Sequence, residues 1–249
     1  MMNMMKKVSM GLVAGALTAL PLVASAQEES SSVGSAGVDF ASAYVFRGVT
    51  FNDEPVAQPY LEAEILPGLT VGAWGNYDIG DYDGALDDGQ FSEIDLYASY
   101  AIPVPCEVTS LSLGYTEYTY PQGGEADREV SLSAGFDIPL APSLGVFYGF
   151  DGAIDKQIYV EAGVGHDLDL AEGVSLGLGA TLGYLNPDEG DSGLSHFTVS
   201  ATIGVGAVSA GVTYIGQIDD DVLVDADAAN GILGYDTEVV FTLSFSKEF

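Results

Sequence analysis

Apolar and polar side chains alternate along most of this chain, and the last segment shows the pattern most clearly. Every second position but one carries Val239, Phe241, Leu243, Phe245 and finally Phe249. From Thr242 onward, the positions between them carry Thr242, Ser244, Ser246 and Glu248. Because successive side chains of a β-strand point to opposite faces, this period of two predicts a strand with one continuous apolar face.

Twelve segments of the chain show this alternation. They lie near residues 36–47, 56–66, 70–80, 93–102, 110–120, 129–138, 144–151, 157–168, 175–186, 195–205, 209–218 and 236–249. After residue 26, no apolar run approaches the roughly 18 residues of a transmembrane helix. An even number of antiparallel strands suits a closed barrel, in which no sheet edge faces lipid. The sequence therefore predicts an all-β fold, a transmembrane antiparallel up-and-down β-barrel.

Residues 1–26 have the features of a cleaved export signal. Lys6 and Lys7 precede an apolar run, and Ala24-Ser25-Ala26 provides a small-x-small cleavage site. A polar lead-in over residues 27–34 follows, and residues 35–249 form the predicted barrel. Cys106 is the only cysteine, so no intramolecular disulfide is expected, and we interpret it as a turn residue.

The composition combines strong acidity with a large apolar fraction. The 37 acidic residues outnumber the 6 basic ones, giving a formal charge of −31, yet 47% of the residues are hydrophobic. So much apolar content excludes simple disorder, and so few bases make nucleic acid an improbable partner. Many acids lie in the longer predicted loops, near residues 81–91, 121–128, 187–194 and 219–235, which we expect to be extracellular. The short turns and the termini of the barrel would then be periplasmic.

Most of the remaining acids lie on the polar strand face, which we expect to line the lumen. The candidate pore-lining residues are Arg47, Glu62, Glu64, Trp74, Asp78, Asp95 and Glu161. Arg47 is the lone cation among them, and alternation points it to the face opposite that of Phe46. Either it forms a constriction with a local transverse electric field, or it only braces the barrel through an internal salt bridge. Inward aromatic residues, such as Tyr60, Tyr97, Tyr118 and Tyr159, either contact solutes or fill space.

Other chemistry has weaker support. Asp219, Asp220 and Asp221, with the later stretch 225–231, offer oxygen ligands, but the second stretch lacks the EF-hand order. We expect either weak divalent-cation binding at the outer loops or a solvated acidic surface. His166 and His196 are the only histidines, and strand alternation places Ser195 and His196 on opposite faces. We therefore expect no enzymatic activity and no cofactor.

Short motifs in a fixed order resemble those of a known family. They are Tyr44-Val45-Phe46-Arg47-Gly48, Gln58-Pro59, Gly72-Ala73-Trp74-Gly75, Glu93-Ile94-Asp95-Leu96-Tyr97 and Gly114-Tyr115-Thr116-Glu117-Tyr118. Together they resemble the TorF family of predicted porins of proteobacterial outer membranes, across nearly all of the chain after residue 26. The end of the chain resembles a barrel-assembly signal carried by Phe241, Leu243, Phe245 and Phe249, from which Lys247 departs.

These observations lead to one expectation of function and one alternative. We expect an outer-membrane porin of a Gram-negative bacterium, a narrow passive diffusion channel that prefers cations or small neutral solutes. The alternative is a non-conducting structural or surface-interaction barrel, its lumen filled by side chains. Outer-membrane lipid and the barrel-assembly machinery are the expected partners, and no feature of the sequence sets the oligomeric state.

Overall fold

The computed structural model describes residues 33–82, 87–106, 108–227 and 232–249. The predicted signal peptide, most of the polar lead-in, Asp83 and the stretch 228–231 lie outside these residues.

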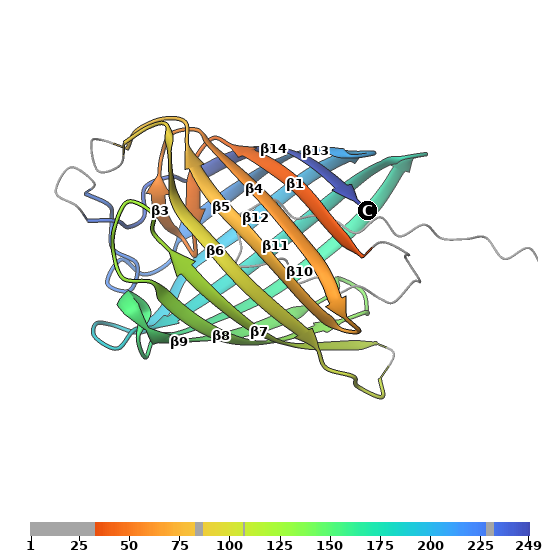
Figure 1. The fold of residues 1–249 in the computed structure, drawn as a ribbon, viewed down its shortest axis with the longest axis horizontal. Helices are drawn as coiled ribbons and strands as arrows, with labels where there is room; N and C mark the ends of the chain where they lie inside the picture. The colour runs from red at the N-terminus through yellow and green to blue at the C-terminus, as the bar shows by residue number, and fades with distance from the viewer. Residues whose placement is uncertain (1–32, 83–86, 107, 228–231) are drawn as a thin grey trace, which may run out of the picture.

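Twelve tilted strands form a closed antiparallel barrel (Figure 1). They are β1 (Gly34–Ala41), β4 (Val56–Leu66), β5 (Leu69–Asp78), β6 (Gln90–Ala101), β7 (Thr109–Thr119), β8 (Asp127–Phe136), β9 (Ser143–Asp151), β10 (Ile158–Ala171), β11 (Val174–Asn186), β12 (Gly193–Val205), β13 (Val208–Gln217) and β14 (Val239–Glu248). Each pairs with its neighbour in sequence, and β1 closes the barrel on β14 with Ser35 opposite Glu248. The predicted fold class is confirmed.

The two ends of the barrel differ. The start of β1 and the last residues of β14 lie at the same end of the barrel, which we call the turn end. The short connections after β4, β6, β8, β10 and β12 lie there too. The opposite end, the loop end, carries the longer connections and a short 3-10 helix, η1 (Gly152–Ile154). Among the described residues, no helix is long and apolar enough to cross a membrane.

The first predicted strand, 36–47, is wrong in its second half. The barrel strand β1 ends at Ala41, and the chain bends at Ser42 and Ala43. A separate hairpin follows, made of β2 (Tyr44–Phe46) and β3 (Val49–Asn52). Continuing the alternation through the bend placed Tyr44 and Phe46 on the outer face, whereas both pack inside the barrel.

The outer surface carries a continuous apolar belt. Large apolar side chains are exposed on every strand of the barrel except β5, and Phe241 is the most exposed at 62%. Inside, the strands β11 to β14 carry small side chains towards the turn end, including Gly179, Ser200, Thr202 and Thr242. An apolar outside around a polar inside is the arrangement that lipid requires of a barrel.

Placing a charge on this belt should destabilise the barrel. Val199 on β12 is 51% exposed, and we expect Val199→Arg to cost about 2–4 kcal/mol, the cost of a base near the bilayer midplane. Urea unfolding from lipid vesicles measures the loss. The neighbouring Ser200→Arg, which faces the lumen, is the control. Equal losses for the two variants would contradict the assignment of faces.

Candidate functional site

A two-residue turn forms the tip of the β2–β3 hairpin. Phe46 pairs with Val49, and Arg47 and Gly48 between them both have positive φ angles, 53° and 85°. Two positive φ angles define a type I′ turn, which matches the twist of a hairpin. A left-handed conformation costs a residue with a Cβ about 1–2 kcal/mol, so the contacts of the Arg47 side chain must hold it there.

The hairpin reaches across the lumen to the opposite wall. It leaves the barrel at β1, and β9 is the sixth strand from β1 in either direction round the barrel. Arg47 contacts that wall, through Glu129 on β8, Phe147 on β9 and Tyr159 on β10. The hairpin therefore spans the full diameter of the barrel.

The Arg47 guanidinium is enclosed by one carboxylate and three rings. Nη1 and Nη2 donate to the two carboxylate oxygens of Glu129 at 2.7 and 2.9 Å. The guanidinium carbon lies 4.7, 4.6 and 4.3 Å from the ring centres of Phe46, Phe147 and Tyr159. Such a planar fork fits a carboxylate and also stacks on rings. Tyr118 donates a further hydrogen bond to Glu129, so this carboxylate is held from two sides.

Apolar packing fixes the base of the hairpin. Val45 and Tyr44 belong to a buried cluster with Val56, Ile215 and Val240, which come from β4, β13 and β14. The Tyr44 ring lies 5.5 Å from that of Trp74, and its hydroxyl donates to Glu93 at 2.9 Å. The hairpin therefore contacts walls on both of its sides.

The described parts of the last long loop, residues 218–227 and 232–238, fold onto the hairpin. The Thr50 amide donates to the carbonyl of Gly234 at 2.7 Å, and the Thr237 amide donates to the Thr50 hydroxyl at 3.0 Å. A Cβ at Gly48 would lie 2.8 Å from Leu223 and 2.9 Å from His196, so only glycine fits at position 48. This loop covers the hairpin beside β12 to β14.

A cavity of about 190 Å³ remains between the hairpin and the loop end, and we call it the mouth cavity. Phe46, Val49 and Phe51 of the hairpin form one side of it. The barrel contributes Tyr118, Tyr120, Tyr159, Glu93 and Asp127. Burial, and then a hydrogen bond to Asp127, raise the pKa of Tyr120, so its hydroxyl stays protonated and donates to that carboxylate at 2.7 Å.

A buried polar network lies on the wall formed by β4 and β5. Asp78 Oδ1 accepts hydrogen bonds from Asn52 and Asn76 at 2.8 and 2.9 Å, and Gln58 donates to Asn76 at 2.9 Å. Asp78 Oδ2, Gln58 Oε1 and Asp95 Oδ1 have no hydrogen-bond partner in the structure. The lumen wall therefore offers unused acceptors beside the hairpin.

The structure places the other candidate pore-lining residues at several levels. Trp74, Asp95 and Glu161 lie in the interior near the hairpin, where Glu161 accepts a hydrogen bond from Tyr159 at 3.0 Å. Glu62 lies nearer the turn end and accepts from Ser35 and Tyr97. Glu64 is exposed at the rim, where it accepts from the Gly68 amide in the turn. Glu64 thus lies away from the constricted section.

The predicted assembly-signal residues all lie on the outer face of β14 or at its end. Phe241, Leu243, Phe245 and Phe249 are exposed by 62, 41, 42 and 55%. Their role in assembly stays a prediction.

The prediction that Ser195 and His196 cannot pair is wrong. Gly183 pairs with His196 and Tyr184 with Leu194, so Ser195 is the extra residue of a β-bulge. A bulge interrupts the alternation of faces, and both side chains point inward, with Ser195 Oγ 3.0 Å from His196 Nδ1. A Cβ at Gly183 would lie 2.6 Å from the His196 ring, so glycine makes room for it.

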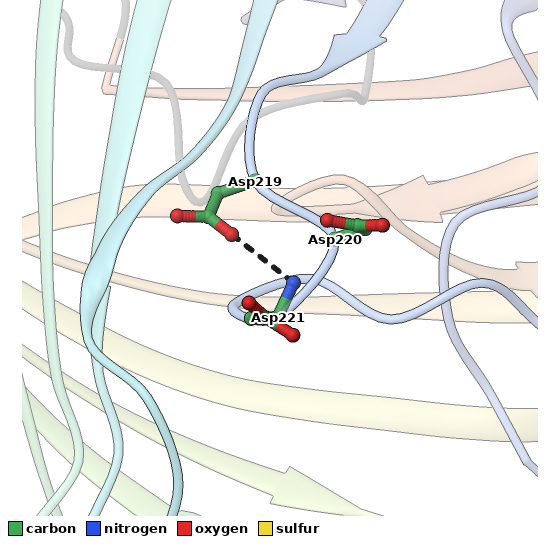
Figure 2. A group of neighbouring side chains, drawn as sticks. All are labelled: Asp219, Asp220 and Asp221. Carbon is green, nitrogen blue, oxygen red and sulfur yellow. Dashed lines mark hydrogen bonds between the residues drawn. The ribbon is translucent and has the colours of Figure 1, made fainter.

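The acidic loop residues Asp219, Asp220 and Asp221 lie close enough together to share a metal ion (Figure 2). Asp219 accepts a hydrogen bond from the Asp221 amide at 3.1 Å, which stabilises the local turn. The remainder of the second candidate stretch, residues 228–231 with Asn230 and Gly231, lies outside the described residues. Cys106 is exposed in the connection after β6, with its sulfur 3.4 Å from the Thr109 hydroxyl.

The sequence interpretation missed the hairpin and the wall residue Phe147, and it placed Glu129 on the polar strand face without including it among the candidate pore-lining residues. The signal was present, because Tyr44-Val45-Phe46 and Val49-Thr50-Phe51 are β-prone runs on either side of Arg47-Gly48. Turn chemistry alone does not predict the hairpin, because Arg-Gly is not one of the usual type I′ pairs, which are led by Asn-Gly.

The geometry defines a β-barrel of the outer-membrane type, with an internal hairpin. Comparison with known proteins agrees with this class. An outer-membrane channel from Pseudomonas putida F1 superposes with a TM-score of 0.50 at 12% identity, covering 91% of this chain and 98% of that one. The NanC porin superposes with a TM-score of 0.50 at 9% identity, covering 87% and 99%. These likenesses concern the fold alone.

The family is defined by sequence. Residues 25–245 match the model of a family described as a bacterial protein of unknown function, Gcw_chp. The chain belongs to this family. No curated protein matches its sequence.

Proposed function

We propose that the protein is an outer-membrane porin, a narrow passive channel whose constriction is the β2–β3 hairpin. The observation that carries the proposal is the hairpin spanning the lumen from β1 to the wall opposite. The hairpin narrows the lumen. Without it, the width of a twelve-strand lumen would lie between that of eight-strand barrels, which side chains fill, and that of porins with 16–18 strands, which hold an open water channel.

Charge in the interior supports a preference for cations, with small neutral solutes also admitted. Arg47 is neutralised by Glu129, whereas Glu62, Asp78, Asp95 and Glu161 have no salt-bridge partner among the described residues. A lumen of one sign attracts counter-ions and repels ions of the same sign. The acidic loops would add to this effect.

Location and orientation complete the proposal. The apolar belt supports a place in lipid, and the resemblance of the motifs to the TorF family supports the outer membrane. The acidic loop end would be extracellular and the turn end, with the termini of the barrel, periplasmic. The proposed partners are outer-membrane lipid, the barrel-assembly machinery and weakly bound divalent cations at the loops.

Single-channel recording of the refolded protein under a salt gradient tests the proposal. We expect small conductance steps, and a reversal potential with the sign that a cation-selective pore gives under the same salt gradient. Absence of conductance would overturn the channel and favour a non-conducting structural barrel, for which the hairpin filling the lumen is the supporting observation. Anion preference would overturn only the electrostatic part.

Arg47→Ala should move the reversal potential further towards that of a cation-selective pore. The variant leaves Glu129 as an uncompensated carboxylate at the constriction. Arg128→Ala is the matched control, because Arg128 is next to Glu129 on β8 but pairs with Glu117 and Asp151 at the surface. An equal shift in both variants, or none in Arg47→Ala, would contradict a role of Arg47 in the constriction.

A further inference from the structure

The mouth cavity has the size of a small molecule. Its volume is about 190 Å³, and a 150 Å³ cavity in another protein binds benzene. A molecule with one ring and a short polar group therefore matches the space. The loop end gives the cavity its outer boundary, through segments such as Ile154 and Gln157 before β10.

Its walls are unusually aromatic for the interior of a polar barrel. Phe46 and Phe51 of the hairpin, and Tyr118, Tyr120 and Tyr159 of the barrel, all line it. The Phe46 and Tyr118 rings lie 5.9 Å apart, and Phe46 and Phe51 lie 6.5 Å apart. Ring faces attract cations and also pack against apolar groups.

Two buried carboxylates give the cavity its charge. Glu93 and Asp127 line it, and each is 5% exposed. Neither forms a salt bridge within the described residues, and Asp95, next to Glu93 on β6, has an oxygen without a hydrogen-bond partner. Burying carboxylates away from water is unfavourable, and the hydrogen bonds that Tyr44 donates to Glu93 and Tyr120 to Asp127 offset this cost only in part, because no cation is paired with either carboxylate.

Arg47 also lines the mouth cavity, and it shows that this interior accepts a cation on aromatic faces. Its guanidinium lies on the rings of Phe46 and Tyr159, both of which also line the mouth cavity. Because its charge is matched by both oxygens of Glu129, it does not cancel the charge of Glu93 and Asp127.

We propose that the mouth cavity binds small organic cations, an ammonium group beside Glu93 and Asp127 with an apolar body among the rings. This inference rests on the proposed function, since it names the solute class that enters the constriction from the loop end. Inorganic cations fit less well, because apolar rings replace their water with weak partners. Anions would be repelled by the two carboxylates of the cavity, Glu93 and Asp127.

Isothermal titration of the full protein in detergent tests the inference with three probes of similar size. Benzylammonium should bind at least about tenfold more tightly than benzyl alcohol, as expected for cation–ring attraction with a buried carboxylate. Benzoate should not bind measurably. Equal binding of the amine and the alcohol, or tighter binding of benzoate, would overturn the proposal.

Variants locate the binding. Asp127→Asn and Glu93→Gln should each remove most of the preference for benzylammonium, whereas Glu62→Gln, nearer the turn end, should leave it unchanged. A preference that survives both cavity variants overturns the assignment. If Asp127→Asn does not fold, Glu93→Gln and the three probes on the unaltered protein still decide.

The titration separates this inference from the proposed function. Selective binding without conductance in bilayers would refute the porin and leave the cation site standing. Conductance without selective binding would refute the site and leave the porin standing.

Discussion

Replacing residues 43–54 by a short glycine–serine turn is expected to raise the single-channel conductance several-fold. The replacement removes the hairpin from the lumen and directly joins β1 to β4, which are already paired from Gly34 opposite Ala63 to Ala41 opposite Val56. A twelve-strand barrel without its internal hairpin has room for a wider water column. Planar-bilayer recording measures the change.

A second shortened loop serves as the control. Removing residues 188–191 shortens the connection between β11 and β12 without touching the hairpin, and should leave the conductance close to that of the unaltered protein. An unchanged conductance after loss of the hairpin would show that the narrowest section lies elsewhere. The heat-dependent mobility of each variant in detergent gels confirms that the barrel has formed.

Glu129→Gln is expected to lower the free energy of unfolding by about 3–5 kcal/mol, because it leaves a buried guanidinium without its carboxylate. The two side chains are 7 and 4% exposed. The double variant Arg47→Met with Glu129→Leu removes both charges and should recover most of that loss. Urea unfolding from lipid vesicles measures the free energy of unfolding of the unaltered protein, the single variant and the double variant.

Glu117→Gln is the matched control for that loss. Glu117 pairs with Arg128 at 2.8 Å, but the two side chains are 28 and 36% exposed. A pair of this kind contributes about 1 kcal/mol or less. If the two single variants lose equal stability, the hairpin tip is not anchored by its ion pair.

Much of the barrel could be predicted because lipid outside and water inside impose a strict alternation on each strand. The predicted strands 56–66 and 175–186 lie within one residue of β4 and β11. Counting the alternating segments predicted an even number of strands, and therefore that the first and the last strand begin and end on the same side of the barrel. Hydrophobic alternation alone therefore defines the wall.

The alternation fails where the backbone leaves the regular ladder. At Ser42 and Ala43 the chain bends into the lumen, so counting by twos through to Arg47 assigned Tyr44 and Phe46 to lipid. At Ser195 one extra residue places two successive side chains on the same face. The alternation of apolar residues marks neither departure, and only the β-prone runs on either side of Arg47-Gly48 indicate the hairpin.

The candidate site was predicted only in part for the same reason. Counting by twos assigned Arg47 to the interior, where its side chain is buried against Glu129, but beyond the bend at Ser42 and Ala43 the residues counted as outward also lie inside. Its partner on the far wall depends on how far the hairpin reaches, and Glu129 lies 82 positions away in sequence. A contact of that range is set by the closed circle of strands, which the local pattern does not contain.

The far anchor of the hairpin also bears on the order in which the molecule is assembled. All contacts of Arg47 with the opposite wall lie on β8, β9 and β10, so they are complete before the last four strands are needed. Ile215 on β13 and Val240 on β14 pack against the other side of the hairpin. If the strands are added in chain order, the last of them close over a hairpin whose tip is already anchored on the opposite wall.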